Sequence, residues 1–369
     1  MRAEKGRLQS ILKRLGLTEK EAEVYVAIAT RGSATAKDLL NTLERIHQPQ
    51  LYNIISSLVR KGFVRVSMGR PKVYAANDLE AIFEVRKKVL ESLKREALSL
   101  LSTIRSLEKD MGEEKSQVFL VRGREGLEAT VLEVLSSSKV EVCAELPTEM
   151  ALKVADTVEA LLQRGVNVYM IVFPEVPKGL AARLAKYSNI ALKRDKLGNF
   201  LFVSADFKVA VYARRRFFGP RKRPVPESEV YGFFISERDL IWRLISTFEN
   251  TWRKTSEPVI YRPPSPDAYP KVFIEYGILL DELEELLRRG YRPYVHVEGL
   301  SVGTREPVIL EGYVVRVNKT DHISNFTLVA DGEELTVGGF DAEVEDIEAF
   351  KVIIERAGKA RARSRSSLA

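Results

Sequence analysis

Cysteine and histidine are scarce in this chain. Its 369 residues include one cysteine, Cys143, and three histidines. A single cysteine excludes an internal disulfide framework and a cysteine-based zinc site, and it indicates a reducing compartment. No apolar run approaches the roughly 18 residues needed to cross a membrane, and the N-terminus lacks the apolar core of a secretory signal. The sequence therefore predicts a cytoplasmic protein with no membrane partner and no metal site.

Motifs of the common catalytic and nucleotide-binding sites are also absent. The sequence has no phosphate-binding loop, no dinucleotide glycine pattern, no serine nucleophile elbow and no metal-spaced cluster of histidines and carboxylates. Residues 199–206 have the spacing of the phospholipase D signature, but Asn199 and Leu201 stand where that chemistry needs a histidine and a lysine. Only Asp206 remains, and a turn residue is the alternative for it. We therefore predict no catalytic residue and no cofactor.

Positive charge, by contrast, is concentrated at one end of the chain. Residues 1–76 hold 14 lysines and arginines against 6 acidic residues, a net charge of +8, whereas the whole chain carries +7. The excess is therefore confined to a segment the size of one small domain. A localised positive field of this kind suits contact with nucleic-acid phosphates.

The same segment, residues 1–76, has the pattern of a winged helix-turn-helix. Capping boxes predict the first two helix starts: Thr18 with Glu21, and Thr35 with Asp38. Pro49 suits the first turn of a third helix, which runs to about Lys61. Two alternating strands, 63–67 and 73–76, follow it and form a hairpin whose turn is the wing.

The third helix carries the side chains expected to read DNA. Its apolar residues fall on one stripe: Leu51, Ile54, Ile55 and Leu58. The predicted DNA-binding residues are the polar ones left toward solvent and two cations at the tip of the wing: Gln48, Gln50, Asn53, Ser57, Arg60, Arg70 and Lys72. Amide side chains pair bidentately with adenine in the major groove, and arginine pairs with guanine or phosphate. We predict double-stranded DNA as a partner; a protein-interaction module with an ordinary solvated face is the alternative.

Residues 77–113 predict a long coiled-coil helix. Apolar residues recur there at alternating steps of four and three from Leu79 to Met111, with charged residues elsewhere. A seam of this length, about 50 Å at 1.5 Å per residue, needs a partner helix. The winged helix is too small to cover it, so we predict pairing with a second copy of the chain rather than with another helix of the same chain. Two-fold pairing would supply two recognition helices, as DNA half-sites require.

Residues 114–256 alternate strands and helices, which predicts a largely parallel α/β sheet covered by helices, with a further hairpin-like pair over residues 199–213. A basic loop at 214–223 interrupts this domain, and we interpret it as a solvated loop rather than a DNA contact.

After a proline-rich linker, residues 271–356 predict one helix followed by a small β-sandwich or barrel, with a hairpin turn at Asp331 and Gly332. Residues 357–369 form a basic tail without apolar content, which predicts disorder. The predicted fold class is therefore α+β, divided among several domains.

These features together resemble the TrmB family of archaeal sugar-responsive transcriptional regulators over about residues 8–354. The most specific matches are Leu51-Tyr-Asn-Ile-Ile-Ser-Ser-Leu58 in the third helix, Pro71-Lys-Val-Tyr-Ala-Ala76 in the wing, and Val337-Gly-Gly339 near the C-terminus. The resemblance implies a winged helix, a coiled coil, a catalytically inert phospholipase-D-like effector domain and a β-rich C-terminal part that shapes a sugar site.

The resemblance also implies which residues contact the sugar: Ser236, Ser324, Asn325, Gly339 and Glu345. Ser324 departs from the family motif, which has an asparagine there. Its hydroxyl is shorter and offers one donor where the amide offers two, so we expect a changed sugar preference. Gln50 likewise stands where the family has an arginine, which bears on the operator sequence.

Each of these residues also has an ordinary structural interpretation. Ser236 can cap the following helix, Gly339 can permit a strand bend, and Glu345 can be a surface carboxylate. A sugar site also needs an aromatic face for the apolar side of the ring, and Phe340 and Tyr313 are the candidates.

The sequence thus predicts a homodimeric, sequence-specific DNA-binding regulator whose operator affinity changes when a sugar effector binds, a maltodextrin or another glucoside. The first alternative is a chromatin-like protein that coats DNA without sequence preference or ligand response. The second, a residual phosphodiesterase, is disfavoured because the catalytic histidine is missing. Whether the sugar raises or lowers DNA affinity remains open at this point, because coupling requires only that it bind two states differently.

Overall fold

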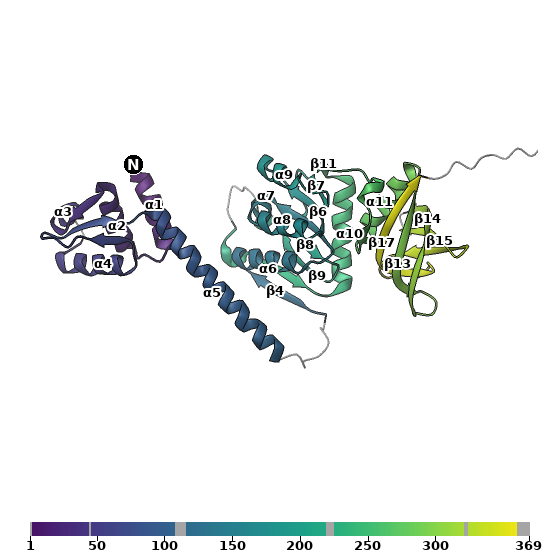
Figure 1. Ribbon diagram of the computed structural model, residues 1–369, viewed down its shortest axis with the longest axis horizontal. Coiled ribbons are helices and arrows are strands. Elements are labelled where there is room, and N and C mark those ends of the chain that lie inside the picture. The colour runs from purple at the N-terminus through teal and green to yellow at the C-terminus, as the bar shows by residue number, and fades with distance from the viewer. Residues whose placement is uncertain (1, 44–45, 108–115, 219–224, 321–323, 360–369) are drawn as a thin grey trace, which may run out of the picture. The chain divides into compact units, whose positions relative to one another are not determined.

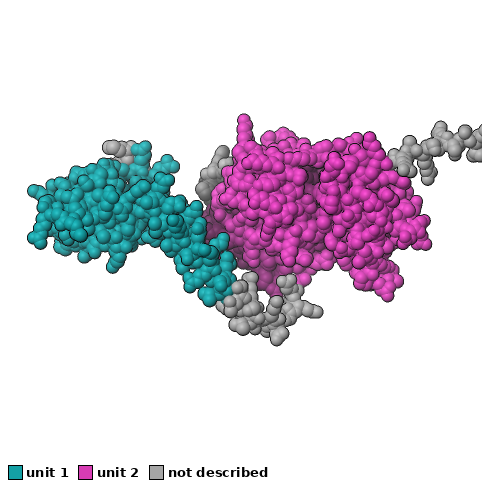
Figure 2. Space-filling view, viewed as in Figure 1, with its two compact units in different colours: residues 1–113 teal, residues 114–369 magenta. Residues whose placement is uncertain are grey.

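The computed structural model describes the chain except for residue 1 and five short segments: 44–45, 108–115, 219–224, 321–323 and 360–369. The chain divides into two compact units, residues 1–113 and residues 114–369 (Figures 1 and 2). The first unit holds a winged helix and one long helix. The second holds an eight-stranded sheet and a β-barrel.

The winged helix is preceded by one additional helix. Its elements are α1 (Arg2–Arg14), α2 (Glu19–Arg31), β1 (Ser33–Thr35), α3 (Ala36–Thr42), α4 (Gln48–Arg60), β2 (Val64–Val66) and β3 (Val73–Ala76). The strands pair antiparallel in the order β1-β3-β2, so the predicted hairpin gains a third strand. Sequence reasoning missed β1 because three residues are too few to show an alternation.

The local signals that predicted these helices are confirmed. The Thr18 hydroxyl accepts the Glu21 amide at 3.3 Å while the Glu21 carboxylate accepts the Thr18 amide at 2.7 Å, and Thr35 and Asp38 repeat this box at α3. Gly32 ends α2 in the left-handed region, with φ 74°. The predicted apolar stripe of α4 is buried: Leu51, Ile54, Ile55 and Leu58. Caps and periodicity therefore predict α2, α3 and α4 of this domain.

The helix after the wing, α5 (Leu79–Leu107), is a single helix of 29 residues, about 44 Å long. Ile82 packs into the core of the winged helix, but farther along the helix large apolar side chains lie in solvent. The exposed ones are Phe83, Val85, Val89, Leu90, Leu93, Leu98, Leu100 and Leu101. Met111, the end of the predicted seam, lies outside the described residues. Neither α5 nor any other helix in the described part of the chain is long and apolar enough to cross a membrane.

The second unit begins with a sheet in the strand order β11-β7-β6-β5-β8-β9-β10-β4. Its strands are β4 (Val118–Arg122), β5 (Glu141–Pro147), β6 (Asn167–Phe173), β7 (Ile190–Arg194), β8 (Phe200–Ala205), β9 (Val209–Arg214), β10 (Tyr231–Ile235) and β11 (Glu257–Ile260). The prediction of a largely parallel sheet is wrong. Only β5–β6 and β6–β7 pair in parallel, because β8, β9 and β10 follow one another without a helix between them and alternate in direction.

Helices cover both faces of this sheet. They are α6 (Arg124–Ser137), α7 (Thr148–Lys153), α8 (Ala155–Gln163), α9 (Lys178–Leu184) and α10 (Arg238–Lys254), with short 3-10 turns η1 (Arg215–Phe217) and η2 (Glu227–Glu229). The first four share one core with the sheet. On the other face α10 shares a second core with the C-terminal domain, which includes Tyr169, Phe248 and Val297 (Figure 1). The sheet and the C-terminal domain are therefore one packed body.

The C-terminal domain is a barrel, which is one of the two architectures that the sequence predicted, the other being a β-sandwich. It comprises η3 (Pro266–Ala268), β12 (Lys271–Phe273), α11 (Tyr276–Arg288), β13 (Tyr291–Ser301), β14 (Pro307–Lys319), β15 (Ser324–Ala330), β16 (Glu333–Gly338) and β17 (Ile347–Lys359). The strand order is β12-β17-β13-β14-β15-β16, and β16 closes the ring by pairing in parallel with β17. The predicted turn at Asp331 and Gly332 joins β15 and β16 with positive φ at both residues.

The last strand runs farther than the sequence predicted. β17 continues to Lys359, so residues 357–359 belong to the barrel rather than to the expected tail. The rest of that tail lies outside the described residues, as does part of the basic loop at 214–223.

Candidate functional site

The exposed face of α4 carries most of the predicted DNA-reading side chains. Three of the five are exposed: Gln48, Asn53 and Arg60. Gln50 is half-buried at the edge of this face. Ser57 differs from the prediction, because it is half-buried and its hydroxyl donates to the Glu21 carboxylate on α2 at 2.7 Å. Its side chain therefore joins two helices of the domain instead of facing solvent.

The structure adds a residue that the sequence reading of α4 omitted. Ser56 is exposed, and helical spacing places it between Asn53 and Arg60 at the centre of the exposed face. Tyr52 is also exposed at 45%. The sequence could have predicted both, because the apolar stripe of α4 is visible in it and these two positions lie on the opposite side of the helix.

The wing presents its cations as predicted from the hairpin. Arg70 and Lys72 are exposed at its turn, and Arg65 is exposed on β2. Exposed cations beside a polar helix face suit phosphate contacts that position a protein on the duplex, while the amide and guanidinium groups of the helix suit base edges.

A buried carboxylate fixes the end of α4 to α2. Glu21 is 5% exposed and accepts hydrogen bonds from the Lys61 ammonium and the Ser57 hydroxyl, both at 2.7 Å. Burial by itself raises the pKa of Glu21, but these bonds and the Thr18 amide outweigh it and lower the pKa to about 2. The carboxylate therefore stays ionised and holds the exposed helix face in orientation.

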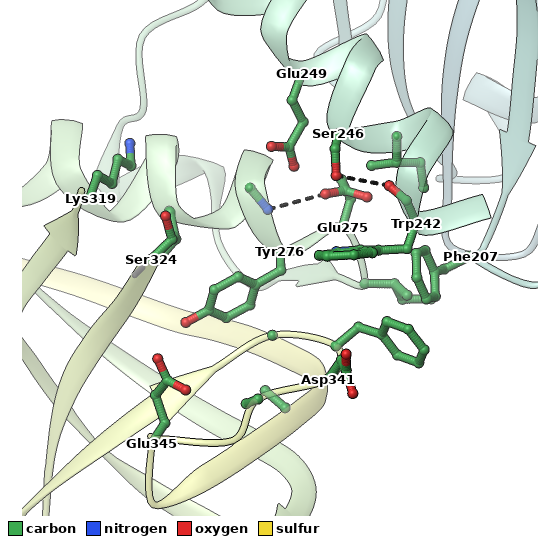
Figure 3. Close-up of a pocket in the computed structure, with 18 of the residues that line it drawn as sticks. Phe207, Trp242, Ser246, Glu249, Glu275, Tyr276, Lys319, Ser324, Asp341 and Glu345 are labelled. Atoms are coloured by element: carbon green, nitrogen blue, oxygen red, sulfur yellow. Dashed lines mark hydrogen bonds between the residues drawn. The ribbon is translucent and has the colours of Figure 1, made fainter. Parts of the chain in front are cut away.

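The second unit contains a pocket of about 990 Å³ (Figure 3). Its walls are α10, the start of α11, the neighbouring ends of β14 and β15, and the loop of residues 339–345 that joins β16 to β17. The pocket thus lies where the sheet domain and the barrel meet within the second unit.

The pocket brings together three of the five predicted sugar contacts. Ser324, Gly339 and Glu345 line it, although β16 separates the first from the other two in the chain. Asn325 is 7% exposed behind them, and its amide donates to the Glu345 carboxylate at 3.2 Å. Ser236 is not among the lining residues; its hydroxyl exchanges hydrogen bonds with the Gln117 backbone beside β4.

The two adjacent glycines of this loop are required by close packing. A Cβ on Gly339 would lie 2.7 Å from Cγ of Tyr276, and a Cβ on Gly338 would lie 2.7 Å from Cβ of Ala342. The Tyr276 hydroxyl donates to the Val337 carbonyl, and its ring stacks on Phe326 at 6.2 Å. The glycines therefore let the loop approach the start of α11, which sets the depth of the pocket.

Aromatic rings form one end of the pocket. The Phe340 ring lies 5.3 Å from that of Phe207 and 6.4 Å from that of Trp242, with the Arg238 guanidinium 4.9 Å from the Phe340 centroid. Phe340 was predicted as a platform, whereas Tyr313 lies outside the pocket and contacts Tyr294. Sequence reasoning missed Phe207 and Trp242 because nothing local marks an aromatic residue as facing a distant loop.

Polar groups line the α10 side of the pocket. Ser246, Glu249 and Arg253 come from α10, and Glu275 precedes α11 (Figure 3). Glu275 is 5% exposed and caps α11 by accepting the Gly277 amide at 3.1 Å. The pocket therefore pairs hydrogen-bonding groups with apolar ring faces, which is the arrangement that fixes a polar ligand of ring shape.

The three residues at the phospholipase D spacing make contacts that stabilise the fold. The Asn199 amide donates to the Thr251 hydroxyl, and Leu201 is fully buried in a hydrophobic core. Asp206 has φ 51° in the β8–β9 turn. Its carboxylate accepts the Ser138 hydroxyl at 3.0 Å and backbone amides of residues 139–141 at 2.8–2.9 Å. The turn interpretation of Asp206 thus fits the structure.

Comparison with known proteins places these parts in one family. Three family models match successive segments: "Sugar-specific transcriptional regulator TrmB" at residues 12–80, the N-terminal subdomain of the TrmB effector-binding region ("EBD") at 117–259, and the C-terminal subdomain of that region in TrmB/TrmBL1 at 268–357. The first coincides with the winged helix, the second with the eight-stranded sheet and the third with the barrel.

Individual proteins are also similar to all or part of this chain. The HTH-type sugar sensing transcriptional regulator TrmBL1 of Pyrococcus furiosus is 25% identical over 350 residues, covering 93% of this chain and 97% of that protein. The structure of TrmBL2, an archaeal chromatin protein, covers 68% of this chain and 98% of its own at 20% identity and a TM-score of 0.37. The phospholipase D family member Nuc from Salmonella typhimurium covers 40% and 99%, at 17% identity and a TM-score of 0.32. Since three models of one family account for its successive domains, the chain belongs to the TrmB family of transcriptional regulators.

Proposed function

We propose that this chain is a homodimeric, sequence-specific DNA-binding regulator of sugar uptake or metabolism genes, and that a sugar bound in the pocket of the second unit changes its operator affinity. The observation that carries the proposal is the meeting of Ser324, Gly339 and Glu345 with the aromatic ring of Trp242 in one pocket of about 990 Å³. A cavity of this size is at the upper end of the roughly 300–1,000 Å³ range of small-molecule sites.

The pocket chemistry matches a sugar. A pyranose presents hydroxyl groups around its edge and apolar C–H groups on its face. Glu345 offers charge-assisted acceptors for a hydroxyl pair, and the Ser324 hydroxyl both donates and accepts. Trp242 and Phe340 supply ring surface for the apolar face. We propose a maltodextrin or another glucoside as the effector.

The first unit supplies the DNA side of the proposal. We propose that Asn53, Arg60 and Gln50 on α4 read base edges while Arg70 and Lys72 of the wing contact phosphates. We further propose that the exposed apolar residues of α5 form a two-stranded coiled coil with a second copy, because burying them relieves unfavourable exposure and provides two recognition helices. The protein acts in the cytoplasm, with no catalytic activity.

Regulation follows if the sugar binds the DNA-competent and DNA-incompetent states with different affinity. The factor by which the sugar changes operator affinity then equals the factor by which the operator changes sugar affinity. Both numbers are measurable independently, so the linkage provides an internal check.

The test combines two titrations on the full chain. A thermal-shift panel of glucose, maltose, trehalose and longer maltodextrins should reveal a sugar that raises the unfolding temperature with increasing concentration. Fluorescence anisotropy with operator and random duplexes should then show an operator affinity that this sugar changes. Equal affinity for both duplexes, with a steep salt dependence and no sugar response, would favour a chromatin-like DNA coat and reject the regulator.

A further inference from the structure

The pocket contains a second hydrogen-bonding group besides the predicted sugar contacts. Glu249 lies one helical turn before Arg253 on α10, and the Arg253 guanidinium donates to the Glu249 carboxylate at 2.9 Å. Both residues line the pocket. A carboxylate beside a guanidinium offers an acceptor next to a donor, which matches two neighbouring hydroxyl groups of a sugar.

A second carboxyl group is in direct contact with this ion pair. The Glu275 and Glu249 carboxyl groups both lie against Gly277, since one accepts its amide at 3.1 Å and the other would be 1.8 Å from a Cβ added to it, and Figure 3 shows the two groups on the same wall. Two ionised carboxylates have no hydrogen atom to place between them, so a hydrogen bond between them requires one proton. Burial disfavours the charged form of a carboxyl group, so we place the proton on the almost fully buried Glu275.

The packing leaves these groups little freedom. One Glu275 oxygen accepts the Gly277 amide, so the other is available to donate to Glu249. A Cβ on Gly277 would lie 1.8 Å from a Glu249 oxygen, which shows how closely Glu249 sits on the start of α11. The remaining titratable or charged groups around the pair come from four elements: Glu141 and Cys143 on β5, Arg253 on α10, Tyr276 and Asp281 on α11, and Lys319 at the end of β14.

We infer that Glu275 carries a proton at neutral pH and donates it in a hydrogen bond to Glu249, and that this bond positions the Glu249–Arg253 pair as a hydroxyl-binding subsite of the effector pocket. When Glu275 loses the proton to water, two facing carboxylates remain and repel each other. Glu249 then leaves its position, and sugar affinity falls. Burial, reinforced by the charge of Glu249, raises the pKa of Glu275, which is the direction this assignment needs. The inference rests on the proposed sugar function.

The decisive variant is Glu275→Gln, because its amide imitates the protonated acid. It can donate to Glu249 and still accept the Gly277 amide. With maltose as the probe, calorimetry on the wild type should show affinity falling by up to about tenfold per pH unit once Glu275 ionises, since one proton is linked to binding. Glu275→Gln should keep the neutral-pH affinity and lose this pH dependence. Glu249→Ala should weaken maltose binding roughly tenfold at neutral pH.

The matched control is Glu141→Gln, which makes the same exchange of acid for amide at a neighbouring buried carboxyl that does not line the pocket. It should retain a pH-dependent maltose affinity. A Glu275→Gln variant with the wild-type pH profile, or one weakened at neutral pH as much as Glu249→Ala, would overturn the inference.

Unfolding measured without sugar separates this inference from the proposed function. A raised carboxyl pKa makes stability fall as pH rises through it, so Glu275→Gln should lose less stability between neutral and alkaline pH than the wild type. If maltose and the other sugars fail to bind the wild type, the sugar function is wrong. The unfolding comparison still decides the proton: equal pH slopes in wild type and Glu275→Gln would reject it.

Discussion

One buried carboxyl group in the first unit and one in the second have opposite charge states. In the first unit, hydrogen bonds from Lys61, Ser57 and the Thr18 amide outweigh burial and lower the pKa of Glu21 to about 2. In the second unit, burial raises the pKa of Glu141 on β5 to about 8, despite the amides of Ile274 and Glu275 that it accepts. The same side chain is thus an anion in one unit and a neutral acid in the other.

The difference comes from what surrounds each group. Glu21 has a cation at 2.7 Å, whereas the second oxygen of Glu141 has no hydrogen-bond partner among the described residues. Apolar side chains show a similar contrast, because α5 exposes leucines while the core shared by sheet and barrel encloses them. A charged pair therefore stabilises the first unit at Glu21, whereas burial decides the state of Glu141 in the second.

The largest expected effect is on assembly. Replacing Leu93 and Leu100 together by lysine puts charge into the proposed seam of α5, and the cost of burying it should abolish the dimer. Light scattering should report a monomer, and operator binding should fall with it. The unfolding of the second unit should be unchanged. An unaltered dimer mass would place the interface elsewhere.

Next in size is the ion pair of the winged helix. Glu21→Ala removes the acceptor for Lys61 and Ser57 and should destabilise the first unit by about 3 kcal/mol at neutral pH. In the wild type this stability is present above pH 4.5 and is lost as pH falls toward 2. Chemical denaturation followed in the first unit measures both. As a control, Glu19→Ala at an exposed position of α2 should have little effect.

Removing the predicted sugar contact Glu345 in the second unit should have a somewhat smaller effect. Glu345→Ala removes charge-assisted hydrogen bonds worth roughly 1.5 to 3 kcal/mol of sugar affinity and should leave sugar-free DNA binding intact. Ser324→Asn should change which sugar binds best. Calorimetry with both variants checks these expectations, and unchanged affinity and preference would make both residues ordinary surface positions.

For DNA reading, Asn53→Ala and Gln50→Ala should each cost about 1 to 3 kcal/mol on a preferred operator and relax its specificity. Lys72→Ala should instead weaken operator and random duplex alike. Anisotropy titrations at fixed salt distinguish the two patterns. Equal losses on both duplexes in the α4 variants would show that this face does not read bases.

Counted per pH unit, the smallest effect concerns the pH dependence of stability. Because the folded-state pKa of Glu141 is raised from 4.5 to about 8, its contribution to stability is full below pH 4.5, declines by at most about 1.4 kcal/mol per pH unit above that, and is lost as pH rises through 8. Glu141→Gln should flatten this decline in the second unit and leave the acid sensitivity of the first unit unchanged. Unfolding curves from pH 5 to 9 measure this decline, and equal pH slopes of stability in the wild type and Glu141→Gln would contradict the prediction.

Local features were the predictable part of this molecule. Capping boxes, the α4 stripe and the Asp331-Gly332 turn each involve residues a few positions apart, and all are confirmed. The hairpin-like pair over residues 199–213 is confirmed by β8 and β9, but the other strand directions were not predictable, since an apolar run such as β8 looks the same whether β5 beside it is parallel or antiparallel.

The candidate site was predictable only through the family resemblance, and only in part. Ser324, Gly339 and Glu345 do line one pocket, but Ser236 lies apart from it. The α10 side of the pocket could not be predicted, because periodicity shows which face of a helix is buried and not which distant loop covers its edge. The contact between Glu249 and Glu275 depends on packing that brings α10 against α11.

The loop that lines the pocket also joins the two strands that close the barrel. Residues 339–345 connect β16 to β17, and these two strands close the ring through only two residue pairs, Val337 with Ile347 and Gly338 with Glu348. Asp346, the residue before β17, exchanges further hydrogen bonds with Thr336 of β16 at 2.7–3.1 Å. A ligand that binds this loop only when the barrel is closed would raise the free energy needed to open the barrel, because binding stabilises the state that binds.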